Sequence, residues 1–471
     1  MRSQQRKLGR IVACVGVAAT LVLSGCAGAS SSSAPAAGGS GDSGASSVAD
    51  SVAKVTDDQL KGTTLQLARF FGDCTTDVGS STDLKKAVGE CPTIQTLTNK
   101  FNAENKWGIK VTRLGGAAWD SYYDALNAAF AGGTPPDVAI MHGSSLVDYA
   151  KRNLLLPLDK LLPVTKTDIT DAVPSAQAAI KYNDVTYAVP FDVHAALAHV
   201  NVDLFKKAGL VNADGTPKLP KSAAEMLADA KIMKQKTGKN YLAVPRSGDN
   251  LGSHLVNSLI MQQGSSVLSS DLTKGNLDTP EAKTAVEFEN SMVNGGFMDG
   301  KQTYDAAGAA FLKGNVAMLF NGTWVVDQYN KDAKFKYEAT NFPTLYKTPA
   351  VWADNHTWTI PVQPKADPVK YRAALEFINF LYTNDAAWAL GTGHISARTS
   401  VLKSAEYAAA PQRKNYAQTG LTIAHPVPHI ANWPAIQKVL TQSVEANWFQ
   451  NVPVDKALKD GSNNITTALK Q

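Results

Sequence analysis

Histidine and serine residues of this 471-residue chain offer two spacings that could support chemistry. His425 and His429 stand four residues apart, a spacing that zinc ligands use on a helix. Pro426 and Pro428 prevent a regular helix there, so we expect no metal site at this pair. Gly41-Asp-Ser-Gly44 resembles a serine-nucleophile motif, but its flexible surroundings supply no base and no oxyanion hole. We therefore expect no metal and no cofactor.

Common catalytic signatures are missing from the sequence. It contains no P-loop lysine motif, no His-Glu-x-x-His pair, no Gly-x-Ser-x-Gly elbow, and no Gly-x-Gly-x-x-Gly that follows a strand. Each of these motifs places reactive groups or phosphate-binding backbone in one short segment. The absence of a motif therefore argues against the class of enzyme that depends on it. The sequence predicts a binding protein and not an enzyme.

An apolar run over 316–320 ends at Asn321-Gly-Thr323 and is followed by Trp324. Apolar runs of this length between turn residues predict a buried strand. A tryptophan just past such a strand either fills the core or forms the wall of a binding site. Sugar sites combine aromatic walls with a few polar groups, because an indole ring packs on the apolar C–H face of a pyranose.

The N-terminus has the pattern of an export signal. Residues 2–10 carry four basic side chains and no acidic one, and the apolar run 11–23 is too short to span a bilayer permanently. Leu23-Ser-Gly-Cys26 resembles the lipobox of bacterial lipoproteins, in which the cysteine is lipidated. We expect a signal peptide over 1–25 and a lipid anchor on Cys26. No later run of 18 apolar residues follows, so the rest should be soluble and lie at the outer face of the cell membrane, held by the anchor alone.

Charge and cysteine content limit the partners further. Four positive charges leave with the signal peptide, which takes the net charge from +5 to about +1, and no basic stripe of the kind that binds nucleic acid is visible.

Cys74 and Cys91 are the cysteines that remain beyond Cys26. In an exported protein they predict a disulfide, and a metal site is the alternative, a poor one without a histidine between them.

Composition and hydrophobic periodicity predict the domain organisation. Residues 26–61 begin with a stretch of almost only Ala, Gly, Ser, Asp and Pro, which predicts a flexible tether. About 410 residues follow, more than one core usually holds, so we expect two lobes. Strands and helices alternate, which predicts an α/β fold with mainly parallel sheets. The expected strands are 63–70, 109–113, 137–141 and 316–320, and the expected helices are 122–130, 222–236, 279–292 and 369–381.

The order of segments resembles the extracellular solute-binding proteins of ABC importers, in the sugar-binding family that includes maltose-binding protein. The segments that carry the resemblance are FNAENKWGIKVT, AAFAGGTPPDVAIMH, NLLLPLDKLL, YAVPFDVHAALAHVNVDLFKKAGL, AAFLKGNVAMLFNGTW, GHISARTSV and VDKALKD. Seven such segments in the same order cover nearly all of residues 62–471.

This resemblance implies a two-lobed periplasmic-binding-protein fold with crossover hinge segments and a ligand cleft between the lobes. The N-lobe would contain 62–193 and 358–398, and the C-lobe 196–355 and 400–471. The implied function is capture of a carbohydrate and delivery to ABC permease subunits by a monomer. A non-sugar solute, such as a peptide or a polyamine, and a ligand-presenting co-receptor for a sensor kinase are the alternatives.

The resemblance also implies site residues. In the family, the tryptophan that follows the strand-end turn stacks on the ligand, and here this residue is Trp324. Trp433 lies in a region that supplies another aromatic platform. Trp119 is a third aromatic candidate, with helix packing as its alternative role, and Trp352 and Trp358 could instead pack the hinge.

Polar candidates lie at strand ends and crossovers. His142 and Ser144 follow a strand at a place where the family makes polar contacts. Asp73 could bind hydroxyl groups, or cap the loop beside Cys74. Arg398, near the third crossover, could serve the cleft or tie the hinge.

One position departs from the family pattern. Maltose-type relatives place a sugar-binding glutamate after Val-Pro at the first crossover, and this chain has His194 there. Asp192 would face the same way in an extended backbone and could supply the carboxylate. A hinge histidine bonded to backbone is the alternative for His194. The departure argues against maltose itself and favours a smaller or different saccharide.

Overall fold

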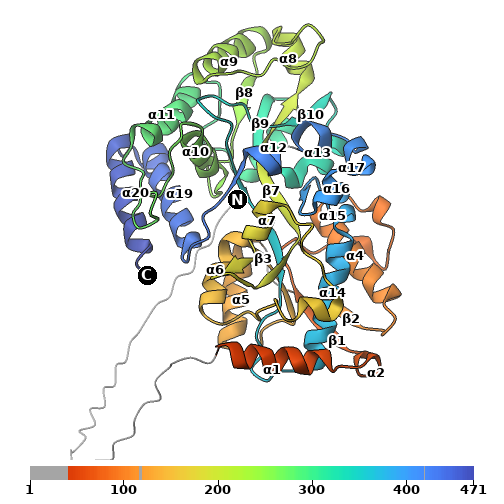
Figure 1. Ribbon diagram of the computed structural model, residues 1–471. Coiled ribbons are helices and arrows are strands. Elements are labelled where there is room, and N and C mark those ends of the chain that lie inside the picture. Colours follow the sequence, from red (N-terminus) through yellow and green to blue (C-terminus); the bar gives the residue numbers. More distant parts are fainter. Residues whose placement is uncertain (1–40, 116–118, 418) are drawn as a thin grey trace, which may run out of the picture. The chain divides into compact units, whose positions relative to one another are not determined.

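The computed structural model describes residues 41–115, 119–417 and 419–471, and two mixed sheets organise them (Figure 1). The first sheet has the order β2-β1-β3-β12-β6, and the path of the second is β14-β11-β7-β9-β8, with β10 and β13 also paired to β7. The first sheet consists of β1 (Thr64–Ala68), β2 (Lys110–Arg113), β3 (Val138–His142), β6 (Ala188–Pro190) and β12 (His356–Thr359).

The second sheet is built on a long central strand, β7, whose ten residues are all buried. Its strands are β7 (Asp192–Asn201), β8 (Asn240–Ala243), β9 (Val316–Gly322), β10 (Tyr337–Thr340), β11 (Val351–Asp354), β13 (Ile395–Ser396) and β14 (Ala424–Pro426). A separate hairpin joins β4 (Lys181–Tyr182) to β5 (Val185–Thr186).

Helices accompany both sheets (Figure 1). Those that pack near the first sheet are α4 (Glu90–Glu104), α5 (Tyr122–Ala131), α6 (Gly143–Lys151) and α14 (Pro368–Thr383). Those near the second sheet are α8 (Val202–Ala208), α9 (Ala223–Thr237), α10 (Leu251–Gln262), α11 (Pro280–Asn294), α12 (Tyr304–Leu312), α19 (Trp433–Gln450) and α20 (Val454–Ala468). Shorter helices are α3 (Thr75–Val78), α7 (Pro174–Ala178), α13 (Val326–Asp332), α15 (Asp385–Thr392), α16 (Thr399–Leu402), α17 (Ala405–Ala409) and α18 (Arg413–Tyr416).

The expected strands and helices are confirmed, with small shifts at their ends. Capping residues in the sequence correctly predicted where several helices begin. Ser222 caps α9 by accepting a hydrogen bond from the Glu225 amide at 3.1 Å. Thr279 caps α11 in the same way, and Pro280 occupies its first position. These caps satisfy amide groups that have no partner inside the helix, which is why Ser, Thr and a first-turn proline mark helix starts.

The expectation of mainly parallel sheets is wrong, because both sheets are mixed. β1 runs parallel to β2 and β3, but β12 lies antiparallel between β3 and β6. β7 pairs antiparallel with β9, β10, β11 and β13. The reversals arise where the chain passes between the sheets, since a strand that returns from the other sheet enters in the opposite direction.

Two crossings connect the sheets through single residues. Phe191 separates β6 of the first sheet from β7 of the second, and Asn355 separates β11 of the second sheet from β12 of the first. The two crossings lie side by side, because the Phe191 amide donates to the His356 carbonyl oxygen at 2.9 Å and the Asn355 side chain donates to the Asp192 carbonyl oxygen at 3.0 Å. Residues at these crossings are therefore held close to both sheets.

Each sheet has its own hydrophobic core, as expected for a folded chain of this length. The first core includes Leu67, Ile140, Trp358 and Phe377, and the second includes Phe205, Leu255, Phe320 and Leu440. Helices cover the faces of both sheets. Side chains of the two sheets therefore meet at the ends of the strands.

The predicted tether ends earlier than expected. Helices α1 (Gly41–Ala53) and α2 (Asp57–Leu60) occupy its second half, and Val52 and Leu60 are fully buried in the first core. These two apolar side chains give the segment apolar surface to bury, which the preceding Ala/Gly/Ser stretch lacks.

Cys26 and the expected signal peptide lie outside the described residues. None of the helices in the described part of the chain combines the length and apolar character that a membrane crossing requires.

The disulfide between Cys74 and Cys91 is confirmed. It ties the loop after β1 to the first turn of α4, next to the strand ends of the first sheet.

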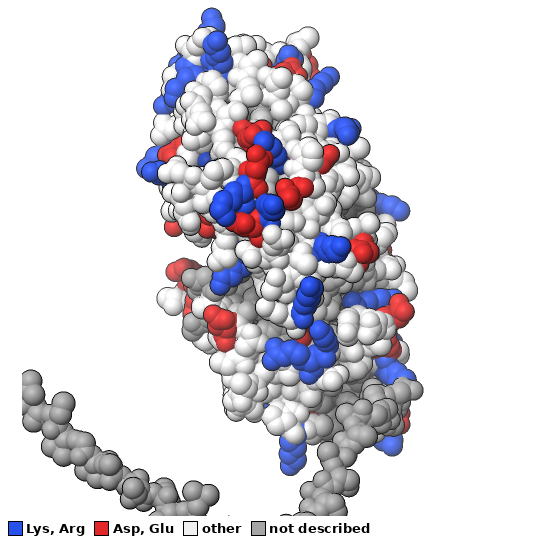
Figure 2. Space-filling view, turned by 90° about the vertical axis from the view of Figure 1, so that its left-hand side faces the viewer, with Lys and Arg blue, Asp and Glu red and all other residues white. Residues whose placement is uncertain are grey.

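On the face shown in Figure 2, lysine and arginine side chains lie among aspartate and glutamate side chains. A surface ion pair joins Lys283 of α11 to Asp455 of α20 at 2.7 Å.

Candidate ligand-binding site

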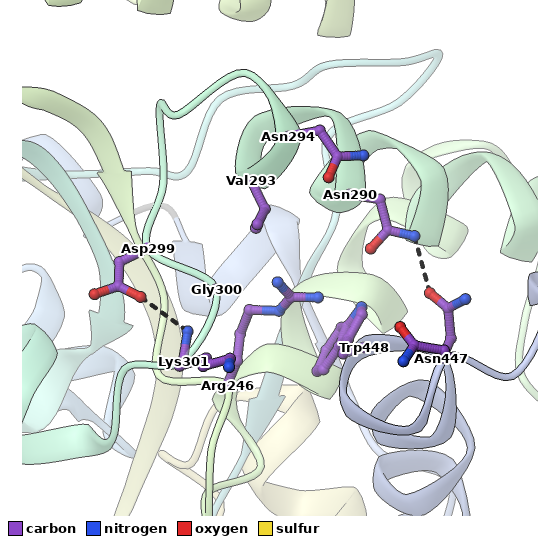
Figure 3. Close-up of a pocket in the computed structure, with 10 residues that line it drawn as sticks. Arg246, Asn290, Val293, Asn294, Asp299, Gly300, Lys301, Asn447 and Trp448 are labelled. Atoms are coloured by element: carbon purple, nitrogen blue, oxygen red, sulfur yellow. Dashed lines mark hydrogen bonds between the residues drawn. The ribbon is translucent and has the colours of Figure 1, made fainter.

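A cavity of about 420 Å³ lies beside α11 and α19, among helices of the second sheet (Figure 3). The Arg246 guanidinium stacks over the Trp448 ring at 3.9 Å and pairs with the buried Glu289 at 3.2 Å. No residue predicted for the site lines this cavity, and its walls come from the second sheet's side alone. A solute held there would not contact both sheets.

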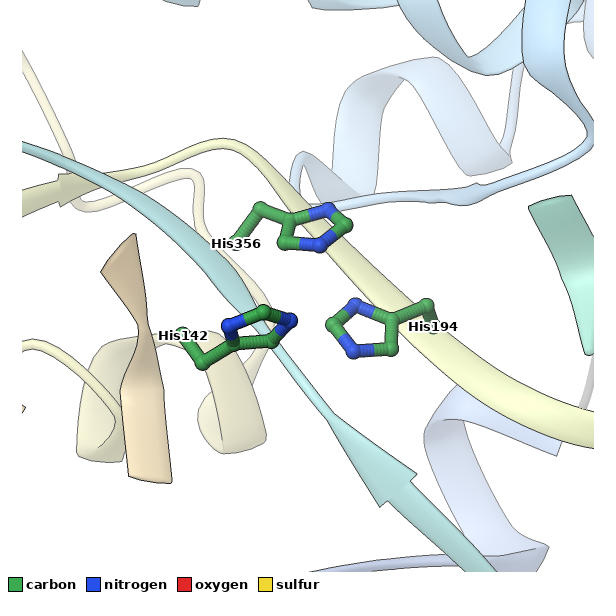
Figure 4. Close-up of side chains that lie close together, drawn as sticks. All are labelled: His142, His194 and His356. Carbon is green, nitrogen blue, oxygen red and sulfur yellow. The ribbon is translucent and has the colours of Figure 1, made fainter. Parts of the chain in front are cut away.

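Four histidines instead meet at the crossings between the sheets, and we call them the histidine cluster: His142, His194, His356 and His394. The ring centroids of His194 and His356 are 4.1 Å apart, and the His142 ring lies 5.6 Å and 5.1 Å from them. Figure 4 shows these three rings turned toward one another. His142 ends β3, His356 begins β12, and their backbones are directly paired, while His194 lies in β7. The cluster therefore joins the first sheet to the second.

Asp192 organises the cluster. One carboxylate oxygen lies 3.2 Å from His194 Nδ1, and the other lies 2.8 Å from His356 Nδ1 and accepts a hydrogen bond from Trp388 Nε1 at 2.7 Å. Asp192 is fully buried. Both oxygens are thus occupied by protein groups, so Asp192 positions the histidines and does not present a free carboxylate as the sequence reasoning expected.

The electrostatics follow from burial and from this one carboxylate. Burial alone raises the pKa of Asp192, but the imidazoles of His356 and His394 hold it well below its usual value. Burial lowers the pKa of His142 and of His194, and His356 adds to both effects. Burial also opposes the charged form of His356, yet the Asp192 carboxylate raises its pKa above the usual value. Burial thus favours the neutral forms of His142 and His194, whereas the Asp192 carboxylate favours the charged form of His356.

His394 has a linking role within the cluster. Its Nε2 lies 2.9 Å from the Glu90 carboxylate at the start of α4, and its Nδ1 lies 3.0 Å from the Thr323 hydroxyl after β9. Both ring nitrogens are therefore occupied, and His394 ties the helix of one sheet to the strand end of the other.

Aromatic side chains surround the cluster from both sheets. On the first sheet's side, Phe70 stacks on His142 at 4.7 Å, and Trp119 lies 5.4 Å from His142 with 59% of its surface exposed. On the second sheet's side, Trp324 lies 6.0 Å from His194, and Trp352 lies 5.8 Å from the same ring. This arrangement of aromatic walls around a few polar groups is typical of small-molecule sites.

Trp352 stacks on His254 of α10, with the ring centroids 3.8 Å apart. Among the described residues, the buried Trp352 Nε1 and His254 Nδ1 have no hydrogen-bond partner. Buried polar atoms of folded proteins are nearly always paired, with protein, water or ligand. These two atoms are therefore unpaired polar groups, and the Trp352 ring that carries one of them lies beside His194 of the cluster.

Trp324, which follows β9 in a short 3-10 turn (Thr323–Val325), is half-buried. Its Nε1 donates to the Tyr304 hydroxyl at 2.8 Å, and its ring packs against the second core. The indole is fixed at the strand end and still partly accessible, which fits a binding wall better than a core position.

Two polar candidates are held by neighbours. Asp73 accepts hydrogen bonds from the amide and hydroxyl of Thr75 and pairs with Arg113 at 2.8 Å, so the structure favours its alternative role as a cap beside the disulfide. Ser144, in the first turn of α6, donates its amide to Asp354 at 3.2 Å. Ser144 lies two residues after His142 of the cluster.

Three other candidates lie away from the cluster. Arg398 pairs with Asp171 at 3.0 Å and covers the Tyr382 ring, so it ties segments near the third crossover. Trp433 is 3% exposed in the second core, and Trp358 is fully buried in the first. Trp433 was expected as a platform, but it shares one face of α19 with Ile436 and Leu440, and that apolar face points to the core.

Sequence reasoning missed His356, His394 and His254. A usable signal was present, because His194, His356 and His394 each lie at or next to one of the three expected crossovers. Their meeting depends on the pairing of His356 with His142, more than 200 residues earlier in the chain. No local pattern encodes such a pairing.

Comparisons with known proteins agree on the kind of protein. A family model described as bacterial extracellular solute-binding protein matches residues 96–415. A binding protein of Brucella abortus (strain 2308) is 23% identical over 393 residues, which are 81% of this chain and 90% of that protein.

Two solved structures have a similar fold. The GacH receptor of Streptomyces glaucescens GLA.O, studied unliganded and with acarbose, superimposes with a TM-score of 0.73 at 19% identity, over 87% of this chain and 99% of the receptor. The maltose-bound MalE3 of T. maritima gives a TM-score of 0.72 at 19% identity, over 87% and 99% of the two chains. The predicted fold class, two α/β lobes of the solute-binding type, is confirmed by these matches.

Proposed function

The chain belongs to the bacterial extracellular solute-binding proteins, and on that premise we propose that it captures a carbohydrate at the histidine cluster and delivers it to an ABC permease. Members of this family bind solutes, and the structural neighbours named above include proteins solved with acarbose and with maltose. The site residues of this chain supply the argument for a sugar.

One observation carries the proposal. Trp119 and Trp324 come from opposite sheets, and each contacts a different member of the same buried cluster, His142 and His194. A pyranose ring between two indoles can pack its C–H faces on both while its hydroxyl groups meet the polar groups at the centre. Aromatic walls on both sides, rather than on one, suit a saccharide enclosed between the two sheets.

The polar groups near these walls can bond hydroxyl groups in both directions. Trp352 Nε1 donates only, whereas His254 Nδ1 donates or accepts according to its tautomer, and Ser144 offers a hydroxyl that does both. A sugar hydroxyl also donates and accepts, so such a mixed set satisfies it without a charged partner. This composition disfavours a polyamine, which would need several free carboxylates, because Asp73 and Asp192 are both occupied by protein groups.

Capture requires the site to open and close. The cluster side chains are almost fully buried, so a solute enters only when the sheets separate at Phe191 and Asn355. Closure over a ligand by motion at a few hinge residues is a common mode of domain movement. In this mechanism the closed, loaded protein, tethered by a lipidated Cys26 outside the described residues, presents the solute to the permease.

Calorimetric titration with a panel of mono- and oligosaccharides, after a thermal-shift screen, tests this function. A ligand that binds only the native state raises the melting temperature, and one sugar or one related group should do so. Peptides and polyamines in the same screen cover the other solute classes. A shift with peptides or polyamines and none with sugars would overturn the carbohydrate assignment. Two permease genes beside the gene would support the importer role over that of a sensor co-receptor.

A further inference from the structure

We propose that His142, His194 and His356 form a binding site for one divalent late first-row transition-metal ion of the Zn²⁺ type, where the two sheets meet. Neither the family nor the proposed function assigns a metal to these residues, and the sequence analysis predicted no metal site. The proposal rests on the convergence of three imidazoles and on the partners that orient them.

The first argument is distance. One ligand nitrogen from each of the three histidines lies within 4.8 Å of the others. Zinc–nitrogen bonds of 2.0–2.1 Å in a tetrahedral site place the nitrogens about 3.3 Å apart. To reach this geometry the nitrogens would move closer by up to about 1.5 Å. The backbones of His142 and His356 are already fixed by strand pairing, so two of the three ligands are held by the sheet itself.

The second argument is the outer partner of each ring. His194 Nδ1 and His356 Nδ1 lie 3.2 Å and 2.8 Å from the Asp192 carboxylate, which can only accept, so each Nδ1 carries a proton. His142 Nδ1 lies 2.8 Å from the Tyr123 hydroxyl, whose oxygen also accepts a hydrogen bond from the His142 amide at 2.9 Å. Among the described residues, no hydrogen bond is recorded to Nε2 of any of the three. Metal-binding histidines nearly always have this arrangement, with one nitrogen held by an outer partner and the other free for the ion.

Other groupings of the same region fit less well. His394, Glu90 and His356 are close enough to bind an ion, as are Asp192, His194 and His394. Both nitrogens of His394 are already bonded, to Glu90 and to Thr323, and both oxygens of Asp192 serve the histidines and Trp388. A ligand set that includes either residue would break several hydrogen bonds, whereas the three Nε2 atoms break none.

Three imidazoles leave a fourth position for water or for an oxygen of the solute, as in open zinc sites with three protein ligands. His142, which lies beside the exposed Trp119, is the least buried of the four cluster histidines. Since two ligands belong to the first sheet and one to the second, a bound ion would hold the sheets together at the crossings.

Zinc titration of the full mature protein, purified without a histidine tag and treated with a chelator, tests the proposal. Calorimetry should show one equivalent of Zn²⁺, and Co²⁺ should give the intense visible absorption of a tetrahedral site. His142→Ala, His194→Ala and His356→Ala should each weaken binding by more than about 100-fold, and Asp192→Asn by about 10- to 100-fold, the range known for outer partners. Circular dichroism of each metal-free variant checks its fold.

The matched control is His425→Gln, which removes an exposed histidine outside the cluster and should leave zinc affinity unchanged. Absence of one-equivalent binding, or binding that survives all three cluster variants, would overturn the site. Anomalous diffraction from zinc-soaked wild-type crystals decides the question without any variant, because the peak must lie between the three imidazoles.

Carbohydrate titration with the chelator present keeps this proposal separate from the proposed function. Sugar binding without zinc binding overturns the metal site alone. Zinc binding at the cluster without any sugar binding supports the metal site and overturns the carbohydrate assignment.

Discussion

The indole ring of Trp324 lies directly over Gly322: a Cβ atom on Gly322 would be 2.0 Å from Cζ3 of the tryptophan. The glycine therefore makes room for the ring, and the hydrogen bond from Nε1 to Tyr304 fixes its direction. The turn Asn321-Gly-Thr323 between the buried strand and the tryptophan thus positions the indole of the proposed binding wall, besides ending the strand.

Truncation of this wall should weaken solute binding. For Trp324→Ala we expect a loss of about 1.5 to 3 kcal/mol, the scale of a large apolar contact, which is roughly a ten- to hundredfold rise in Kd. The fold should persist because the side chain is half-buried. The matched control is Trp358→Ala, a fully buried tryptophan whose loss should cost about 3 to 5 kcal/mol of stability. Calorimetry measures the affinity of both variants, and denaturation measures their midpoints. Unchanged affinity together with a much lower midpoint for Trp324→Ala would place Trp324 in the core.

Gly322→Ala should reproduce most of that loss without touching the ligand. The backbone at Gly322, with φ −95°, accepts alanine, so the cost arises from the displaced indole. We expect the affinity of Gly322→Ala to fall by about tenfold or more, and the same change in a Trp324→Ala background to have little further effect. A double-mutant cycle by calorimetry measures this coupling, and additive losses would contradict it.

Reduction of the disulfide should destabilise the loop after β1. Closing 17 residues contributes at most about 3 kcal/mol in the chain-entropy model, and less for a surface loop. The urea midpoint of the wild type should fall with reductant, whereas that of the Cys74→Ser, Cys91→Ser double variant should not respond. Two free thiols in the denatured, unreduced chain would contradict the pairing.

Asp385 should make the protein less stable as the pH rises. Burial raises its pKa to about 8 in the fold, against 3.8 without burial, and its carboxyl group is bonded to Ser396. Between these values the folded state keeps a proton that the unfolded state has lost. The contribution is therefore complete below about pH 3.8 and disappears by about pH 8, at up to about 1.4 kcal/mol per pH unit.

Asp385→Asn should remove this slope, since the amide does not titrate. The check is the free energy of unfolding at pH 5, 6, 7 and 8. Asp58→Asn, on an exposed side chain, serves as the control and should keep the wild-type slope. Parallel profiles for wild type and Asp385→Asn would show that the buried carboxyl is ionised in the fold.

Cys26→Ser should release the protein into the medium, because Cys26 is the predicted lipidation site. A single changed atom removes the acyl acceptor, and the rest of the chain has no other expected membrane contact. Fractionation of cells that express the variant measures this, with Cys74→Ser as the comparison that should stay on the membrane. Retention of Cys26→Ser would contradict the anchor.

Local signals predicted much of the fold, and pairing over long distances decided the rest. The caps Ser222 and Thr279 start their helices by accepting hydrogen bonds from amides three residues away, so this information lies within one short segment of the sequence. The cluster depends on His356 lying opposite His142 in the sheet, and on the crossings that bring His194 beside them. The role of Trp433 was predicted wrongly because the sequence does not show whether an aromatic residue at a helix start faces the core or a ligand site. The orientation of the apolar face of α19 decides this.

The order of strands in the first sheet has a consequence for how the protein is made. β12 occupies the place between β3 and β6, yet it is translated long after them: β6 ends at Pro190 and β12 begins at His356. At about 5–20 residues per second, the nascent chain waits roughly 8 to 33 s with two unpaired strand edges. Such edges are templates for wrong pairing with other chains. A chain kept unfolded by its export machinery until residue 359 is available passes through this interval without exposing a half-built sheet.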